Sequence, residues 1–144
     1  MKPDWILIAN AANARLLQRE AGEPLVVLKS FEHAASRLHS SELGDDKAGK
    51  QKADRAFGGA AFPPRTDPHE KEHLHFAREL AVQLEQAAGE GRFQHLSIYA
   101  SSPFLGHLKA QLGEATGRLL ASAHDLDLTS FGLAEVESRI AALH

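Results

Sequence analysis

The chain has 144 residues, of which 43% are hydrophobic and 24% charged, and its formal net charge is -3. This composition is that of a globular protein of one domain, and the small negative charge does not favour tight non-specific binding to nucleic acid. Because the chain has no cysteine, disulfides, thiolate metal sites and cysteine nucleophiles are excluded, which agrees with a reducing compartment.

The apolar segments are short throughout. The run nearest the N-terminus, residues 5–9 (WILIA), is too short for the core of a signal peptide. No stretch approaches the ~20 apolar residues that span a membrane. We therefore expect a cytoplasmic protein that makes no contact with a membrane.

The first part of the chain predicts three strands, at residues 5–9, 14–19 and 25–31. They are separated by turn sequences at residues 10–13 (NAAN) and 21–24 (AGEP). Connections this short join only antiparallel neighbours, so the three strands form a meander.

The second part alternates helices with strands. Pro68 suits the first turn of a helix that Thr66 or Asp67 caps, and its apolar side chains recur three and four residues apart until Gly89. The elements predicted after it are a strand at 93–100, a helix from Pro103 to residue 112, a strand at 118–123 and a last helix at 133–143.

Strands separated by helices pair in parallel through right-handed crossovers. The sequence therefore predicts one α/β domain over residues 1–144, with a mixed five-stranded sheet flanked by three helices. The sheet combines an antiparallel three-strand meander with a parallel βαβ half. This is the element order of the ribonuclease H-like fold.

A polar stretch, residues 33–67, separates the two parts, and acids alternate with bases along it. Loops longer than ~12–15 residues are uncommon in compact domains, and are usually functional or disordered. We expect a flexible, solvated loop here. Its end carries Gly58-Gly59-Ala60 shortly before the first helix, which makes it the first place to look for function.

A series of short motifs runs along nearly the whole chain. They are WILIANAANARLL at 5–17; Arg37, Glu42-Leu43, Asp46 and Gly49; Asp67-Pro68, Phe76-Ala77, Leu80-Ala81 and Leu84; Pro103-Phe104-Leu105-Gly106 and Leu108; and Asp125-Leu126 with Leu128-Thr129. In this order they resemble the bacterial host attachment proteins, which are described as required for attachment to host cells.

Those proteins are similar in turn to the middle domain of archaeal and eukaryotic peptide-chain release factors, which has a ribonuclease H-like fold. There, a Gly-Gly-Gln loop ahead of a long helix promotes peptidyl-tRNA hydrolysis on the ribosome. Gly58-Gly59-Ala60 stands in the corresponding place, but Ala60 lacks the side-chain amide. The resemblance thus implies a non-catalytic domain without cofactor, which contacts RNA, the ribosome or a protein, and a homo-oligomer is a further possibility.

The rival hypothesis is a hydrolase. It would use either the Gly58-Gly59 loop for residual ester hydrolysis, or a metal held by His69 and His73. Residues 69–73 (HEKEH) match H-E-x-x-H, a zinc-binding pattern when it lies on a helix. Acidic residues are also expected in the first turns of any helix, and no third ligand follows at a suitable spacing, so we expect no metal.

The residues chosen as candidate binding residues are polar or glycine positions that match the family pattern, or that follow a strand: Asn10, Arg15, Arg37, Glu42, Asp46, Gly58, Gly59 and Asp125. No catalytic residue is predicted. Nuclease chemistry of the ribonuclease H type is disfavoured, because it needs several acids on neighbouring strands. For Arg37, Glu42 and Asp46, a salt-linked loop explains the pattern as well as a binding site does.

The other candidates also have structural explanations. Asn10 suits a turn, and Arg15 suits an exposed strand face. Asp125 follows the last strand, where ligands bind in open α/β sheets, whereas Asp127 with Thr129 is expected to cap the last helix. Residues 101–103 (SSP) lead from a strand into a helix, where they fit either an anion site or an N-cap.

Overall fold

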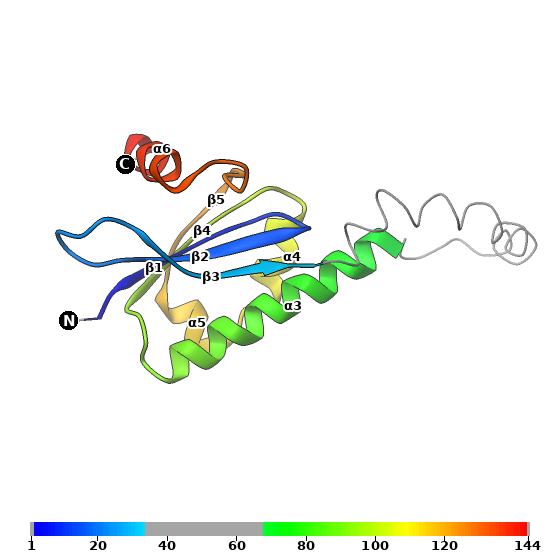
Figure 1. Cartoon of the computed structure of the whole chain (residues 1–144). Helices are drawn as coiled ribbons and strands as arrows, with labels where there is room; N and C mark the ends of the chain where they lie inside the picture. The colour runs from blue at the N-terminus through cyan, green and yellow to red at the C-terminus, as the bar shows by residue number, and fades with distance from the viewer. Residues whose placement is uncertain (1, 34–67, 144) are drawn as a thin grey trace, which may run out of the picture.

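The computed structural model describes residues 2–33 and 68–143. The strands are β1 (Asp4–Ala9), β2 (Asn13–Arg19), β3 (Val26–Glu32), β4 (His95–Ala100) and β5 (Leu120–Asp125). The helices are α3 (Pro68–Gly89), α4 (Phe104–Gln111), α5 (Glu114–Leu119) and α6 (Leu133–Leu143). Figure 1 shows their arrangement around the sheet.

The five strands form one sheet in the order β3-β2-β1-β4-β5. β1 pairs antiparallel with β2, and β2 antiparallel with β3, while β1 with β4 and β4 with β5 are parallel. The meander and the parallel half therefore meet at β1. This order and these directions are those of the ribonuclease H-like fold, as the sequence predicted.

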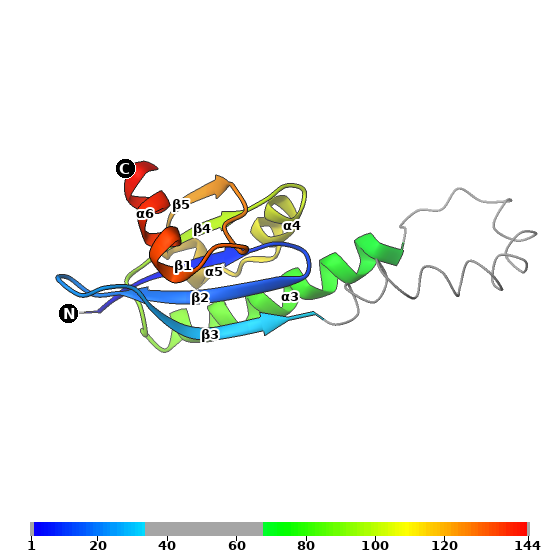
Figure 2. The same cartoon turned by 45° about the horizontal axis from the view of Figure 1, so that its top comes forward.

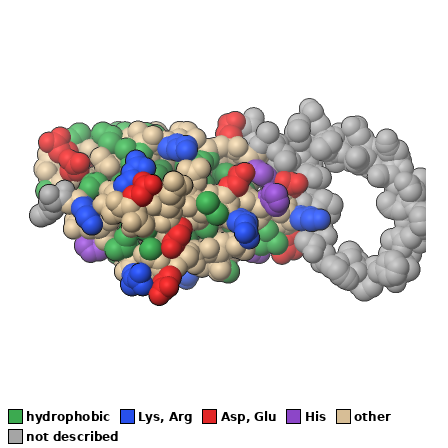
Figure 3. Space-filling model, turned by 90° about the horizontal axis from the view of Figure 1, so that it is seen from below, with side chains coloured by type: hydrophobic (Ala, Val, Ile, Leu, Met, Phe, Trp, Pro, Cys, Tyr) green, Lys and Arg blue, Asp and Glu red, His purple; other side chains and the backbone are tan. Residues whose placement is uncertain are grey.

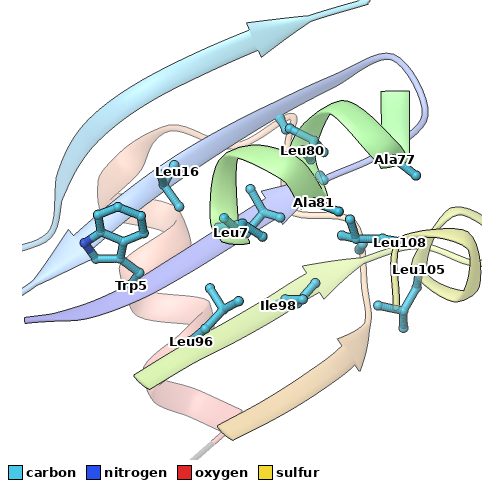
Figure 4. Packing of buried hydrophobic residues seen from close by; sticks show 14 of the residues in the cluster. Trp5, Leu7, Leu16, Ala77, Leu80, Ala81, Leu96, Ile98, Leu105 and Leu108 are labelled. Atoms are coloured by element: carbon cyan, nitrogen blue, oxygen red, sulfur yellow. The ribbon is translucent and has the colours of Figure 1, made fainter. Parts of the chain in front are cut away.

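Helices cover both faces of the sheet (Figures 1 and 2): α3, α4 and α5 lie on one face and α6 on the other. β1 is central, and its side chains alternate between the two layers. Trp5 and Leu7 join the core beneath α3 and α4, which Figure 4 shows from close by, whereas Ile6 and Ile8 join the core beneath α6.

Helix α3 packs through its predicted apolar stripe. Phe76, Ala77, Leu80, Ala81 and Leu84 are all at most 3% exposed, because residues three and four apart share one side of a helix. Burying each large apolar side chain contributes about 1.5–3 kcal/mol. This packing fixes α3 along β1 and β2 beside the edge strand β3.

The prediction of three helices was wrong, because the described residues include a fourth, short helix, α5, before β5. Residues 118–119, which were predicted to start the strand, complete this helix, and β5 begins only at Leu120. The other predicted bounds agree within one or two residues, which is the usual uncertainty of element ends.

The start of α5 is capped from α3. Glu85 accepts hydrogen bonds from the backbone N–H groups of Ala115 (3.2 Å) and Thr116 (3.0 Å) and from the Thr116 hydroxyl (2.8 Å). The Thr116 N–H, then its hydroxyl, hold the pKa of the Glu85 carboxyl below its ordinary value, against the opposing effect of burial. A Cβ at Gly113 would collide with this carboxylate, so glycine at that position lets the cap form.

Candidate functional site

Polar residues gather where the parallel strands end. Ala9 of β1 pairs with Ala100 of β4, which pairs with Asp125 of β5. The residues that follow these strands therefore lie at one edge of the sheet, the place where open α/β sheets bind ligands. Two predicted site residues, Asn10 and Asp125, are at this carboxyl edge, and Arg15 of β2 lies beside it.

Asn10 forms four hydrogen bonds, as many as its amide can make. Its Oδ1 accepts from the N–H groups of Ala12 (2.8 Å) and Asn13 (2.9 Å), which builds the turn between β1 and β2. Its Nδ2 donates to Asp127 Oδ2 (3.2 Å) and Thr129 Oγ1 (2.9 Å). The expected turn role is confirmed, and the same side chain also holds the segment between β5 and α6.

Arg15 is half-buried rather than on the exposed strand face expected for it. Its Nη2 donates to the backbone carbonyls of Leu128 (3.3 Å), Thr129 (3.1 Å) and Phe131 (2.6 Å). These carbonyls belong to the segment between β5 and α6, so the guanidinium fastens that segment to the sheet.

Asp125 binds within the chain. Its Oδ1 accepts from the Ser102 N–H (3.1 Å) and its Oδ2 from the Ser102 hydroxyl (2.8 Å). The sequence suggested an anion site at residues 101–103. The group that binds there is the carboxylate of Asp125 in the same chain. Asp125 remains exposed, so the contact joins β5 to the start of α4 without closing off the surface.

Asp127 does not cap the last helix, because α6 begins only at Leu133. Its Oδ1 accepts from the N–H (2.9 Å) and the hydroxyl (2.6 Å) of Thr129, which makes a local turn. Burial raises the pKa of the Asp127 carboxyl, but the hydrogen bonds from Thr129 and Asn10 outweigh it, so the net pKa lies below its ordinary value. The ionised form is thus the one that the folded chain favours.

His33 marks the place where the described chain leaves β3. Its N–H donates to the Ala12 carbonyl (2.9 Å), its ring stacks on Phe76 with centroids 5.2 Å apart, and its Nε2 lies 2.9 Å from Glu72 Oε1. The end of β3 and the first turns of α3 are therefore held together at the carboxyl edge. Five candidates lie outside the described residues: Arg37, Glu42, Asp46, Gly58 and Gly59.

Within the described part of the chain, no group of three or more His, Asp or Glu side chains is arranged to hold a metal ion. His73 lies on α3 as predicted, but the side chain of His69 is outside the description, so the H-E-x-x-H hypothesis is not tested. A protein that works without metal or cofactor stays a prediction.

Polar side chains at the carboxyl edge form hydrogen bonds within the chain. Asn10, Arg15 and Asp125 each use their polar atoms to join segments far apart in sequence. Sequence reasoning missed their partners, because Thr129 is 119 residues from Asn10. For Asn10 and Asp125, the sequence signal was their position after predicted strands, and for Arg15 it was the match to the family pattern.

The fold and the site define an α/β domain of the ribonuclease H-like class, with its carboxyl edge held by internal hydrogen bonds. The family described as "Protein required for attachment to host cells" matches residues 5–140, and the chain belongs to that family. No curated protein matches the sequence. None of the described helices is long and apolar enough to cross a membrane.

The solved structures that are similar to this chain include three different proteins. The archaeal translation termination factor aRF1 is 16% identical, with a TM-score of 0.48, over 92% of this chain and 32% of its own. The Ppx/GppA phosphatase of Aquifex aeolicus is 9% identical, with a TM-score of 0.44, over 85% of this chain and 35% of its own. The PilM-PilN type IV pilus biogenesis complex is 12% identical, with a TM-score of 0.39, over 95% of this chain and 41% of the matched chain. This chain thus spans about a third of the first two proteins and somewhat more of the third.

Proposed function

We propose that this protein is a non-catalytic, cytoplasmic binding domain, which contacts RNA or the ribosome through residues 34–67, and that its effect on attachment is indirect. The observation that carries the proposal is the joint at the carboxyl edge. His33, Glu72 and Phe76 hold the two described ends of this segment together beside the network of Asn10 and Arg15. These contacts set the two described ends of the segment at one place on the domain.

The internal use of the polar groups supports binding over catalysis. A general base or nucleophile needs a polar atom directed at a substrate. The amide of Asn10 is fully used, and the Asp125 carboxylate accepts two hydrogen bonds from Ser102. In the sequence, Ala60 stands where release factors carry the loop glutamine, so the resemblance also favours a domain without hydrolase activity.

The test compares binding with hydrolysis in purified components. The wild-type chain should sediment with ribosomes and should not release the peptide from peptidyl-tRNA. Deletion of residues 47–62 should abolish co-sedimentation while leaving the circular dichroism spectrum and thermal transition in place, because loop length itself costs little. Ala60→Gln tests the hydrolytic alternative, and it should also give no release.

Two outcomes would contradict the proposal. Peptide release by the wild-type chain, lost on Gly59→Ala, would make the protein an enzyme. Co-sedimentation that is unchanged by the deletion would place the contact surface elsewhere on the domain.

A further inference from the structure

We propose that a cavity at the amino edge of the sheet binds a free α-amino acid with a basic side chain. The amino edge is the end of the sheet where β1 and β4 begin and where a turn joins β2 to β3 (Figures 1 and 2). Arg19 holds the carboxylate of this ligand, and Glu137 of α6 holds its α-ammonium group. The inference goes beyond the proposed function, since the carboxyl edge and residues 34–67 take no part in it.

The cavity has a volume of about 620 Å³, which lies within the roughly 300–1,000 Å³ of small-molecule sites. It is bounded by the start of β1, the end of β2 with the turn after it, the residue before β4, and α6. These segments are far apart in sequence, so the cavity forms only in the folded chain. The charged residues that line it are Lys2, Asp4, Arg19, Glu20, Glu23 and Glu137.

Arg19 is half-buried, and it lines a second, smaller cavity of about 240 Å³ together with Tyr99 and Ile140. Burial raises the pKa of Tyr99, whereas the positive charge of Arg19 lowers it. The guanidinium is therefore close to a buried side chain of β4, where the two cavities meet beneath α6. It is a fixed inner group of the cavity rather than part of its rim.

The guanidinium of Arg19 has no ion pair within residues 2–33 and 68–143, although Asp4 is its register partner on β1. Asp4 Oδ1 instead accepts from Gln94 Nε2 (3.2 Å) and lies 3.2 Å from His95 Nδ1. A guanidinium has five N–H donors in a planar fork, which fits a carboxylate with two parallel hydrogen bonds. Arg19 is thus available to bind the carboxylate of a ligand.

Glu137 is the matching acid on α6. It is half-buried, and among the described residues it forms neither a hydrogen bond nor an ion pair. Its neighbours on the same helix differ, since Arg139 Nε donates to Glu135 Oε2 at 2.8 Å. A half-buried charge without a partner loses part of its hydration, and the ammonium group of a ligand would offset that loss.

Opposite charges elsewhere on the domain pair with each other. On the side of α3 and α5, acidic and basic side chains are interspersed (Figure 3), and Arg118 Nη1 lies 3.1 Å from Glu114 Oε2. At the cavity, no ion pair within the described part of the chain joins Arg19 to Glu23 or Glu137. Opposite charges that line one cavity without meeting suit a ligand that carries both signs.

The balance of charge selects the side chain of the ligand. Four of the six charged lining residues are acids, so acids remain in excess when Arg19 and Glu137 are paired with the two α-groups. Glu20 and Glu23 lie in the turn after β2, where the Glu23 N–H donates to the Glu20 carbonyl (2.9 Å). Attraction between opposite charges therefore favours a basic side chain that extends toward this turn.

Isothermal titration calorimetry of the full chain with L-arginine at neutral pH tests the proposal. L-Arginine should bind one to one with a dissociation constant of about 1 mM or lower. Agmatine lacks the carboxylate and L-glutamate lacks the basic side chain, so each should bind about tenfold or more weakly. This series uses the wild-type chain throughout, so its result does not depend on the folding of a variant.

Matched substitutions assign the groups. Arg19→Met and Glu137→Gln should each raise the dissociation constant of L-arginine about tenfold or more. Glu135→Gln on the same helix and Arg118→Met on α5 should leave it unchanged, because neither residue lines the cavity. Circular dichroism spectra and thermal transitions of the variants control for folding.

Nuclear magnetic resonance of the wild-type chain locates the ligand. On addition of L-arginine, the backbone amide signals of residues 19–23 and 137–141 should shift, whereas those of Asn10 and Asp125 at the carboxyl edge should not. Four results would each overturn the proposal: no saturable binding up to ~50 mM L-arginine, equal affinity for agmatine, an unchanged dissociation constant in Arg19→Met, or shifts confined to the carboxyl edge.

Discussion

The carboxyl edge of the sheet and the outer edge of β3 differ in whether their polar groups form hydrogen bonds within the described residues. At the carboxyl edge, Asn10 and Arg15 direct side-chain donors onto the segment between β5 and α6, over 100 residues away in sequence. Along β3, within the described residues, backbone groups of the outer edge remain available beside Val26 and Val27. The side chains of the first edge join distant segments of the fold, whereas Val82 beside the second edge is exposed, so substitutions at the two edges should differ in their effect on stability.

Arg15→Met should have the largest effect. It removes a charged donor from the carbonyls of Leu128, Thr129 and Phe131, and hydrogen bonds of charged groups contribute about 1.5–3 kcal/mol. We expect the free energy of unfolding, measured in urea, to fall by about 2–3 kcal/mol. Arg118→Met loses an exposed pair with Glu114 and a minor attraction for Glu85, and it should change the free energy of unfolding by less than about 1 kcal/mol. Equal losses in both variants would contradict the fastening role.

Asn10→Asp should have the second largest effect on the free energy of unfolding. It replaces the donor to Asp127 by a second carboxylate, which raises the pKa of Asp127 and should cost about 2 kcal/mol at neutral pH. The repulsion requires both groups to be ionised, so the loss relative to wild type should shrink as the pH falls below about 4. Urea unfolding at several pH values measures this. Asn10→Ala is the control, and its loss should vary less with pH.

The two glycines near α5 should respond in opposite directions. Gly113→Ala brings a Cβ into the Glu85 carboxylate and should lower the melting temperature by disrupting the cap. Gly117, inside α5, has open space around its Cβ position, so Gly117→Ala should raise stability by about 0.5–1 kcal/mol. Thermal unfolding of both variants tests this, and a stabilising Gly113→Ala would exclude the cap.

Acid should weaken the fold through Asp127 and Glu85. The folded-state pKa of each lies below its ordinary value, 3.8 and 4.5 respectively. Each therefore contributes stability above that value, and the contribution is lost as the pH falls through the lower folded-state pKa. Asp127→Asn and Glu85→Gln should each flatten the stability profile below about pH 4.5. Unchanged slopes in both variants would show that these carboxylates are not linked to folding.

The smallest effect is expected at the other edge. Val82→Lys changes an exposed side chain on α3, so the free energy of unfolding of the monomer should stay within about 0.5 kcal/mol of wild type. Urea unfolding at low protein concentration measures this. A large loss there would mean that Val82 supports the fold itself.

Most of the fold was predictable from local patterns. The apolar run of β1, the short turns after it and the apolar stripe of α3 each report burial or chain reversal within a few residues. Together with the handedness of crossovers, they predicted the antiparallel meander and the parallel half. The same reasoning placed Asp125 after the last strand of the parallel half and Asn10 in the turn after the first strand, but it did not bring the two together.

Tertiary structure alone decided the rest. Residues 114–119 (EATGRL) include a helix-disfavouring glycine, and their helix begins under a cap from Glu85, which is 31 residues from Thr116. The half-buried position of Arg15 depends on the segment that passes over β2. Such partners are distant in sequence, and a hydrogen bond between them forms only after packing has placed their backbones together. Local sequence patterns therefore do not predict it.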